Sequence, residues 1–131
     1  MEHQANVHGD PLEVCSLDPV TGFYRDGYTT TGPEDLGSHT VCTVLTSEFL
    51  EHQRELGNDL ATPMPQYGFP GLAPGDRWGV CASLWFESYT AGVKAPVVLR
   101  ATNIAALDHV PQDALVECAA DAPDDPSSLL T

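Results

Sequence analysis

Proline and glycine interrupt this chain so often that much of it must be turn and loop. The 131 residues include 11 Gly and 11 Pro, and segment 63–76 alone holds four prolines and three glycines. Proline removes a backbone donor and glycine favours turns. We therefore expect segment 63–76 to be an ordered loop pinned by Tyr67, Phe69 and Leu72, and most of segment 11–76 to be turn and loop.

Short apolar runs predict a few regular elements between these loops. A β-branched run at 40–45 predicts a strand. A helix over 47–56 follows, capped by Thr46 or Ser47, ended by Gly57 and presenting Gln53 to water. A strand from 78 is expected to lead into a short helix at 86–89, and the second choice for this stretch is one helix over 77–91. A strand is also predicted at 96–102, followed by helices over 103–109 and 111–118.

Few strands, each next to a helix, predict an α+β domain. Its architecture would be a small antiparallel sheet with helices on one face, in two layers, with long ordered loops rich in Gly and Pro. The length fits one domain. We expect residues 1–118 to form it, with 1–10 as a loose leader and 119–131 as an acidic, disordered tail.

The charge of the chain excludes several classes of partner. Five Lys and Arg stand against 19 Asp and Glu, which gives a formal net charge of −14. Such a chain is unsuited to nucleic acid, and no apolar run is long enough to cross a membrane. Lys94 is the only lysine, which favours a protein adapted to a salty cytoplasm over an ordinary acidic protein.

The cysteines suggest a first candidate site. A cytoplasmic location predicts reduced thiols at all four positions, and no CxxC motif is present. His39 and Cys42 could form a thiol–imidazole site for catalysis or, joined by Cys15 or Cys81, for a metal. The favoured interpretation is that Cys42 and Cys81 are small buried residues, with no metal or other cofactor.

Charged and polar loop residues form the second candidate site. Arginine can clamp a carboxylate or phosphate, and clustered carboxylates can hold a divalent cation. The favoured alternative is that the acidic side chains fix the loops and that the arginines pair with them. With His39, the aromatic residues could also line a small apolar pocket. The loop candidates are Arg25, Asp26, Asp35, Asp59 and Arg77.

Several long stretches resemble an uncharacterised bacterial family, domain of unknown function 2237 (DUF2237). They are 11–27 (PLEVCSLDPVTGFYRDG), 31–42 (TGPEDLGSHTVC), 46–50 (TSEFL), 57–60 (GNDL), 69–78 (FPGLAPGDRW) and 91–99 (AGVKAPVVL). The resemblance covers about residues 6–118 and implies a compact two-layer α+β domain without an established activity. Members usually carry cysteines where this chain has Tyr28, Thr29 and Gly79, which implies a depleted thiol set here.

Two functional hypotheses follow. The favoured one is a small cytoplasmic module that binds an unidentified small molecule or protein through its Gly/Asp/Arg loops. The alternative is an enzyme or metal-binding protein centred on His39 and Cys42, with Arg25, Asp26 and Asp35 as polar partners. Neither the enzyme class nor the oligomeric state follows from the sequence.

Overall fold

The fold combines two short strands with three helices around one main core. The structure is a computed structural model that describes residues 4–121. Its strands and helices are β1 (Val41–Val44), α1 (Ser47–Glu55), β2 (Arg77–Val80), α2 (Ala82–Thr90) and α3 (Gln112–Glu117). Three 3₁₀ turns are added at Pro65–Tyr67, Leu99–Ala101 and Ile104–Asp108.

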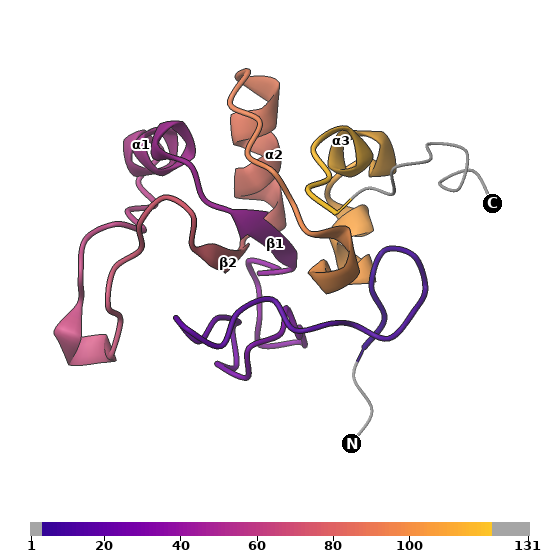
Figure 1. Ribbon diagram of the computed structural model, residues 1–131, viewed down its shortest axis with the longest axis horizontal. Coiled ribbons are helices and arrows are strands. Elements are labelled where there is room, and N and C mark those ends of the chain that lie inside the picture. Colours follow the sequence, from indigo (N-terminus) through magenta and orange to yellow (C-terminus); the bar gives the residue numbers. More distant parts are fainter. Residues whose placement is uncertain (1–3, 122–131) are drawn as a thin grey trace.

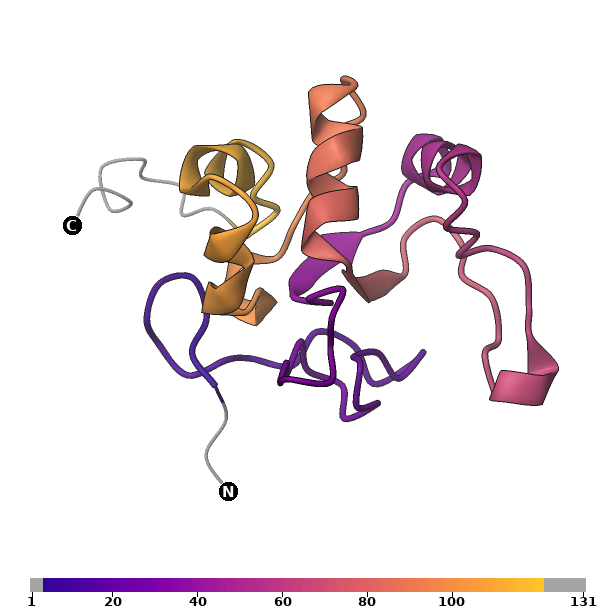
Figure 2. The same ribbon diagram turned by 180° about the vertical axis from the view of Figure 1, so that it is seen from behind.

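Strands β1 and β2 form an antiparallel ladder in which Val41 pairs with Val80 and Cys42 with Gly79. The three helices lie on one side of this ladder, and the N-terminal loops lie on the other (Figure 1). The view from behind shows the same arrangement (Figure 2). The predicted α+β class, with a small antiparallel sheet, is confirmed.

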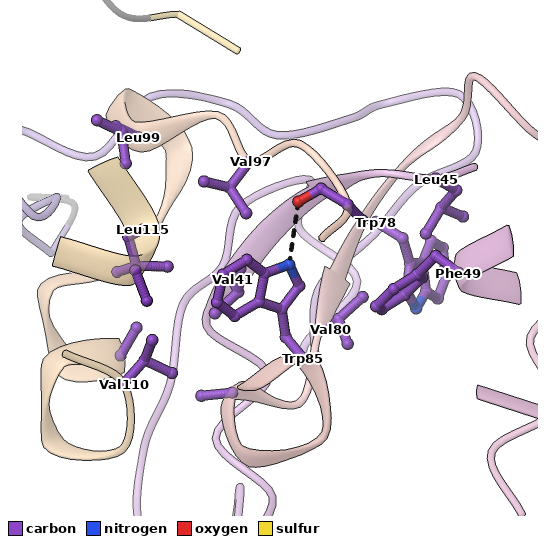
Figure 3. Packing of buried hydrophobic residues seen from close by; sticks show 14 of the residues in the cluster. Val41, Leu45, Phe49, Trp78, Val80, Trp85, Val97, Leu99, Val110 and Leu115 are labelled. Carbon is purple, nitrogen blue, oxygen red and sulfur yellow. Dashed lines mark hydrogen bonds between the residues drawn. The ribbon is translucent and has the colours of Figure 1, made fainter. Parts of the chain in front are cut away.

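Alternation along β1 sends its side chains into two separate clusters. Val41 joins the main core with Val80 and the fully buried Trp85, whereas Cys42 joins a smaller cluster around Val98. Trp85 lies beside Val41 in the main core, and its indole N–H donates to the Ala95 carbonyl at 3.3 Å (Figure 3). The face of the ladder that carries Cys42 is therefore the face against which the N-terminal loop with Cys15 packs.

Helix α1 begins and ends where the sequence predicts, but Gln53 does not face water as predicted. Thr46 caps the helix by accepting a hydrogen bond from Phe49 N–H, and Gly57 follows its end with φ of +90°. Gln53, predicted to face water, is fully buried against α2. Its amide donates to the Leu84 carbonyl and to the Ser88 hydroxyl, which removes the cost of burying it.

The strand predicted at 96–102 does not form. Val97 makes single bridges to Thr43 and Ala119, and the chain then turns into the 3₁₀ segment Leu99–Ala101. The run is apolar because Val97, Leu99 and Ala101 are buried, not because it pairs in a ladder. An apolar run of this length does not by itself distinguish a strand from a buried turn.

The proline-rich loop at 63–76 is ordered, but only part of it is anchored in the core. Leu72 is buried, and Phe69 packs edge-to-face on Trp78 at a ring-centroid distance of 5.6 Å. Tyr67, predicted to pin the loop, is 78% exposed at its tip.

Both ends of the described segment are held by tertiary contacts. Asn6 is buried and bridges Asn103, so residues 4–10 are not a loose leader. At the other end Asp121 accepts hydrogen bonds from Leu99 N–H and Arg100 N–H, so residues 119–121 belong to the folded unit. The rest of the predicted tail, 122–131, lies outside the described residues.

No helix within residues 4–121 is long and apolar enough to span a membrane.

Candidate functional site

A pocket of about 350 Å³ lies where three segments of the chain meet. The N-terminal loops, the loop after α1 and the junction between β2 and α2 each supply part of its wall. The lining residues are Gly22, Phe23, Arg25, His39, Asn58, Leu60, Phe69, Trp78, Gly79, Val80, Cys81 and Leu84. Two of the predicted site residues, Arg25 and His39, therefore share one cavity, and Cys81 joins them.

His39 is held in this pocket by a buried carboxylate. The turn that precedes it contains Ser38 in a left-handed conformation, φ +50°, and this turn brings His39 back over Asp35. The Asp35 carboxylate, whose side chain is fully buried, accepts hydrogen bonds from His39 N–H at 2.9 Å and from the Thr31 hydroxyl at 3.0 Å. His39 Nδ1 lies 2.6 Å from Asp35 Oδ1.

The environment of Asp35 favours its ionised form. Burial raises the pKa of this carboxyl group, but the hydrogen bonds from the His39 ring, His39 N–H and Thr31 together outweigh burial and leave the pKa below its ordinary value. An ionised Asp35 keeps the bonded proton on Nδ1 of His39. Nε2 has no hydrogen-bond partner within residues 4–121, and the His39 side chain lines the pocket.

Arg25 is the cation of the pocket. Its backbone is left-handed, φ +56°, its guanidinium donates to the Gly22 carbonyl, and it lies over the Trp78 ring at 5.0 Å from the centroid. Cation–π stacking of this kind holds the guanidinium in place while leaving N–H donors available.

The prediction that Arg25 and Arg77 pair with loop carboxylates is wrong. The ion pairs within residues 4–121 are those of His39 with Asp35 and of Lys94 with Glu117. Arg77 is exposed on β2 and does not line the pocket.

The prediction of four reduced thiols is also wrong. Cys15 and Cys42 form a disulfide with a Cα–Cα distance of 5.8 Å, and both are buried. Cys42 points into the cluster with Val98 because of the strand alternation of β1. The proposed His39–Cys42 thiol–imidazole site therefore does not exist in this structure.

Cys81 is the thiol that the structure brings to His39. It is half-buried at the N-cap of α2, and its Sγ lies 3.4 Å from the Ser83 hydroxyl. A Cβ placed on Gly37 would lie 3.0 Å from His39 Cε1, 3.5 Å from His39 Nδ1 and 3.6 Å from Cys81 Sγ, so the imidazole and the thiol flank the same small space. The sequence analysis named Cys81 only as a residue that could join a site formed by His39 and Cys42.

Asp26 and Asp59 fix turns outside the pocket. Asp26 accepts hydrogen bonds from Tyr28 N–H and the Thr30 hydroxyl. Asp59 accepts from Thr62 at 2.6 Å, and this bond, with backbone N–H donors, lowers the pKa of the carboxyl. These contacts confirm the loop-fixing role considered for the acidic residues.

The four potential metal ligands Cys15, His39, Cys42 and Cys81 do not converge. Within residues 4–121, no three His, Cys, Asp or Glu side chains gather in a way that could hold a metal ion.

The family model described as "uncharacterized protein conserved in bacteria (DUF2237)" matches residues 5–119. The chain belongs to the DUF2237 family. Every residue of the pocket lies within the matched range. No curated protein sequence matches the chain.

Proposed function

We propose that this DUF2237 protein is a small-molecule-binding module whose ligand carries a negatively charged group. The observation that carries the proposal is the charge of the pocket. The chain has 19 Asp and Glu, yet the pocket lining contains none of them and does contain the cation Arg25. The protein as a whole repels anions, whereas the residues that line this cavity carry no negative charge.

The remaining walls favour a ligand with an apolar or planar body. Phe23, Phe69 and Trp78 supply aromatic surface, and Leu60 and Leu84 supply aliphatic surface. Ligand pockets commonly combine such walls with a few polar groups that fix orientation. The Arg25 guanidinium, stacked on Trp78, is placed to donate two hydrogen bonds to a carboxylate or phosphate.

The test uses benzoate and inorganic phosphate as probes, with benzamide as the uncharged analogue of benzoate. Binding is followed by NMR on the indole N–H of Trp78 and the amide N–H groups of Gly79 and Cys81. We expect benzoate to shift these signals in a saturable way and Arg25→Gln to weaken binding by about tenfold to a hundredfold, since a hydrogen bond to a charged group contributes about 1.5–3 kcal/mol.

Arg77→Gln is the matched control, because it removes the same charge from an exposed position outside the pocket. Equal effects of Arg25→Gln and Arg77→Gln, or equal binding of benzamide and benzoate, would contradict the proposal. Saturable binding of phosphate but not benzoate would assign the ligand to the phosphate class.

We also propose that the protein works in a salty cytoplasm, because its acidic surface is better tolerated when counterions screen it. The cytoplasmic location stays a prediction. The reduced thiols that this location predicts are not found at Cys15 and Cys42, which form a disulfide.

A further inference from the structure

We propose that Cys81 is a nucleophile that takes an acyl group from a carboxylate-bearing ester bound in the pocket, with His39 as its base. The preference for a carboxylate-bearing substrate rests on the proposed function. The nucleophilic role of Cys81 rests on separate observations, which concern its neighbours.

The first observation is the arrangement of the thiol and the imidazole. Both flank the space beside Gly37, and both line the same pocket. Asp35 holds Nδ1 of His39, so Nε2 is the ring nitrogen left to act as the base. This is the division of labour found in nucleophile–base–carboxylate triads. No hydrogen bond joins His39 to Cys81 within residues 4–121, and in such triads this bond often tightens only when a substrate is bound.

The second observation concerns backbone donors beside the thiol. A capping side chain normally accepts from the N–H groups at the second and third helical positions, but α2 has no such side-chain cap. Ala82 N–H donates to the Ser38 carbonyl. Ser83 N–H and Leu84 N–H have no acceptor within residues 4–121. Free N–H groups in the first turn of a helix can stabilise the oxyanion of a tetrahedral intermediate.

The third observation is the contrast with Cys118, the other free thiol. Cys118 does not line the pocket. Burial, with Glu117 nearby, raises its pKa and so disfavours the thiolate. The chain thus provides its own internal control for thiol reactivity.

Water is the only reactant that the reaction needs besides the ester. The thiol proton of Cys81 passes to Nε2 of His39 as the Sγ–carbon bond forms. The carbon–oxygen bond to the alcohol then breaks, and the proton on His39 goes to the departing oxygen. Water hydrolyses the resulting thioester, which releases the acid and restores the thiol.

The experiment exposes the full chain to 4-nitrophenyl acetate and to 4-nitrophenyl hydrogen succinate, which carries a carboxylate. Mass spectrometry of the intact chain and of its peptides locates the acyl group. We expect the adduct on Cys81 in the parent protein and in Cys118→Ala, and its loss in Cys81→Ala. Acylation of Cys118 at the same rate as Cys81 would overturn the proposal.

His39 needs a readout that separates a base from a structural support. His39→Ala should slow acylation of Cys81 about a hundredfold, a typical contribution of a positioned base, and added imidazole should restore part of the rate. A structural role would not be rescued in this way. Gly37→Ala is the second variant, because its methyl group enters the space between imidazole and thiol at a position where φ is not left-handed. An unchanged acylation rate in both variants would overturn the role of His39.

The same data separate this inference from the proposed function. Arg25→Gln should lower the ratio of the succinate rate to the acetate rate, whereas Arg77→Gln should not change it. Acylation of Cys81 with a ratio insensitive to Arg25→Gln supports the nucleophile and contradicts the anionic ligand. Saturable benzoate binding without faster acylation of Cys81 than of Cys118 supports the binding site and contradicts the nucleophile.

Discussion

At the scale of single residues, Asp35 ties the loop conformation to the chemistry of the pocket. Its carboxylate is fully buried and accepts from Thr31 and from two groups of His39. It therefore determines both the path of the chain and the tautomer of the imidazole.

We expect Asp35→Asn to lower the free energy of unfolding by about 1–3 kcal/mol at neutral pH. The asparagine NH₂ group would replace a buried carboxylate oxygen and would face N–H or O–H groups that also donate hydrogen bonds. The pKa of Asp35 is below its ordinary value of 3.8 in the folded protein, so ionised Asp35 stabilises the fold above that value, and this stabilisation is lost as pH falls through the lower, folded pKa. Urea unfolding at neutral and acid pH should show a weaker acid dependence in Asp35→Asn. The control Asp26→Asn, at an exposed turn, should change less.

The thiol of Cys118 allows a second residue-scale prediction. Because burial raises its pKa above the ordinary value of 9.0, alkylation by iodoacetamide should rise at higher pH than for a cysteine in an unstructured peptide. Measurement in the Cys81→Ala variant isolates this thiol. An alkylation profile equal to that of the peptide would contradict the expected effect of burial.

At the scale of elements, a buried polar seam joins α1 and α2. Gln53 donates to the Ser88 hydroxyl at 2.8 Å and to the Leu84 carbonyl, and accepts from the Asn58 amide. His52 Nδ1 lies 2.7 Å from the same hydroxyl. These hydrogen bonds fix the position of α1 along α2 more specifically than an apolar contact would.

Gln53→Leu should destabilise the protein by about 2 kcal/mol, because it leaves the Asn58 amide and the Leu84 carbonyl without their buried partner. Thermal and urea unfolding would measure the loss. Gln112→Leu, an exposed position on α3, is the matched control and should change stability by less than about 0.5 kcal/mol. A loss in Gln53→Leu no larger than in the control would show that the seam contributes little.

The elements that could be predicted are those whose signals are local. The cap at Thr46, the β-branched residues of β1 and the stop at Gly57 all lie next to the element they define, and the structure confirms them. Gln53 was misassigned because polarity was interpreted as exposure, whereas its partners come from α2. Segment 96–102 was misassigned because burial alone explains its apolar residues.

The pocket could be predicted only in part, for the same reason. His39 and Arg25 were identified by residue type, and the structure brings them together. The partner thiol was assigned to Cys42, three residues from His39, although alternation turns Cys42 toward Cys15. Cys81 lies more than forty positions away in sequence and enters the same pocket as His39 through the antiparallel ladder, a long-range proximity that spacing does not encode.

At the scale of the whole molecule, the disulfide fastens the N-terminal loops to the sheet. It links Cys15 to Cys42 of β1 across 27 residues, and these residues include Arg25, Asp35 and His39. Replacing both cysteines by alanine should lower the free energy of unfolding by about 2–4 kcal/mol, since a closed loop restricts the unfolded chain. Urea unfolding of the double variant, beside Cys118→Ala as a control for thiol removal, measures this. Equal stability of the two variants would contradict a fastening role.

The net charge leads to a prediction for the molecule as a whole. Residues 4–121 contain one ion pair between a lysine or arginine and a carboxylate, Lys94 with Glu117, so most of the 19 acidic groups in the chain are balanced only by solvent ions. Raising KCl from about 0.1 M to 2 M shortens the Debye length from about 10 Å to less than about 3 Å and weakens this repulsion. The melting temperature should therefore rise with salt.

Salt also strengthens apolar burial, so the melting temperature alone does not identify the cause. The variant Glu13→Gln, Glu51→Gln, Glu55→Gln removes three exposed charges without changing the core. If repulsion is the cause, this variant melts higher than the parent at low salt and gains less from KCl, because part of the repulsion is already gone. An equal gain in both proteins would assign the effect to apolar burial, and no gain in either would contradict adaptation to a salty environment.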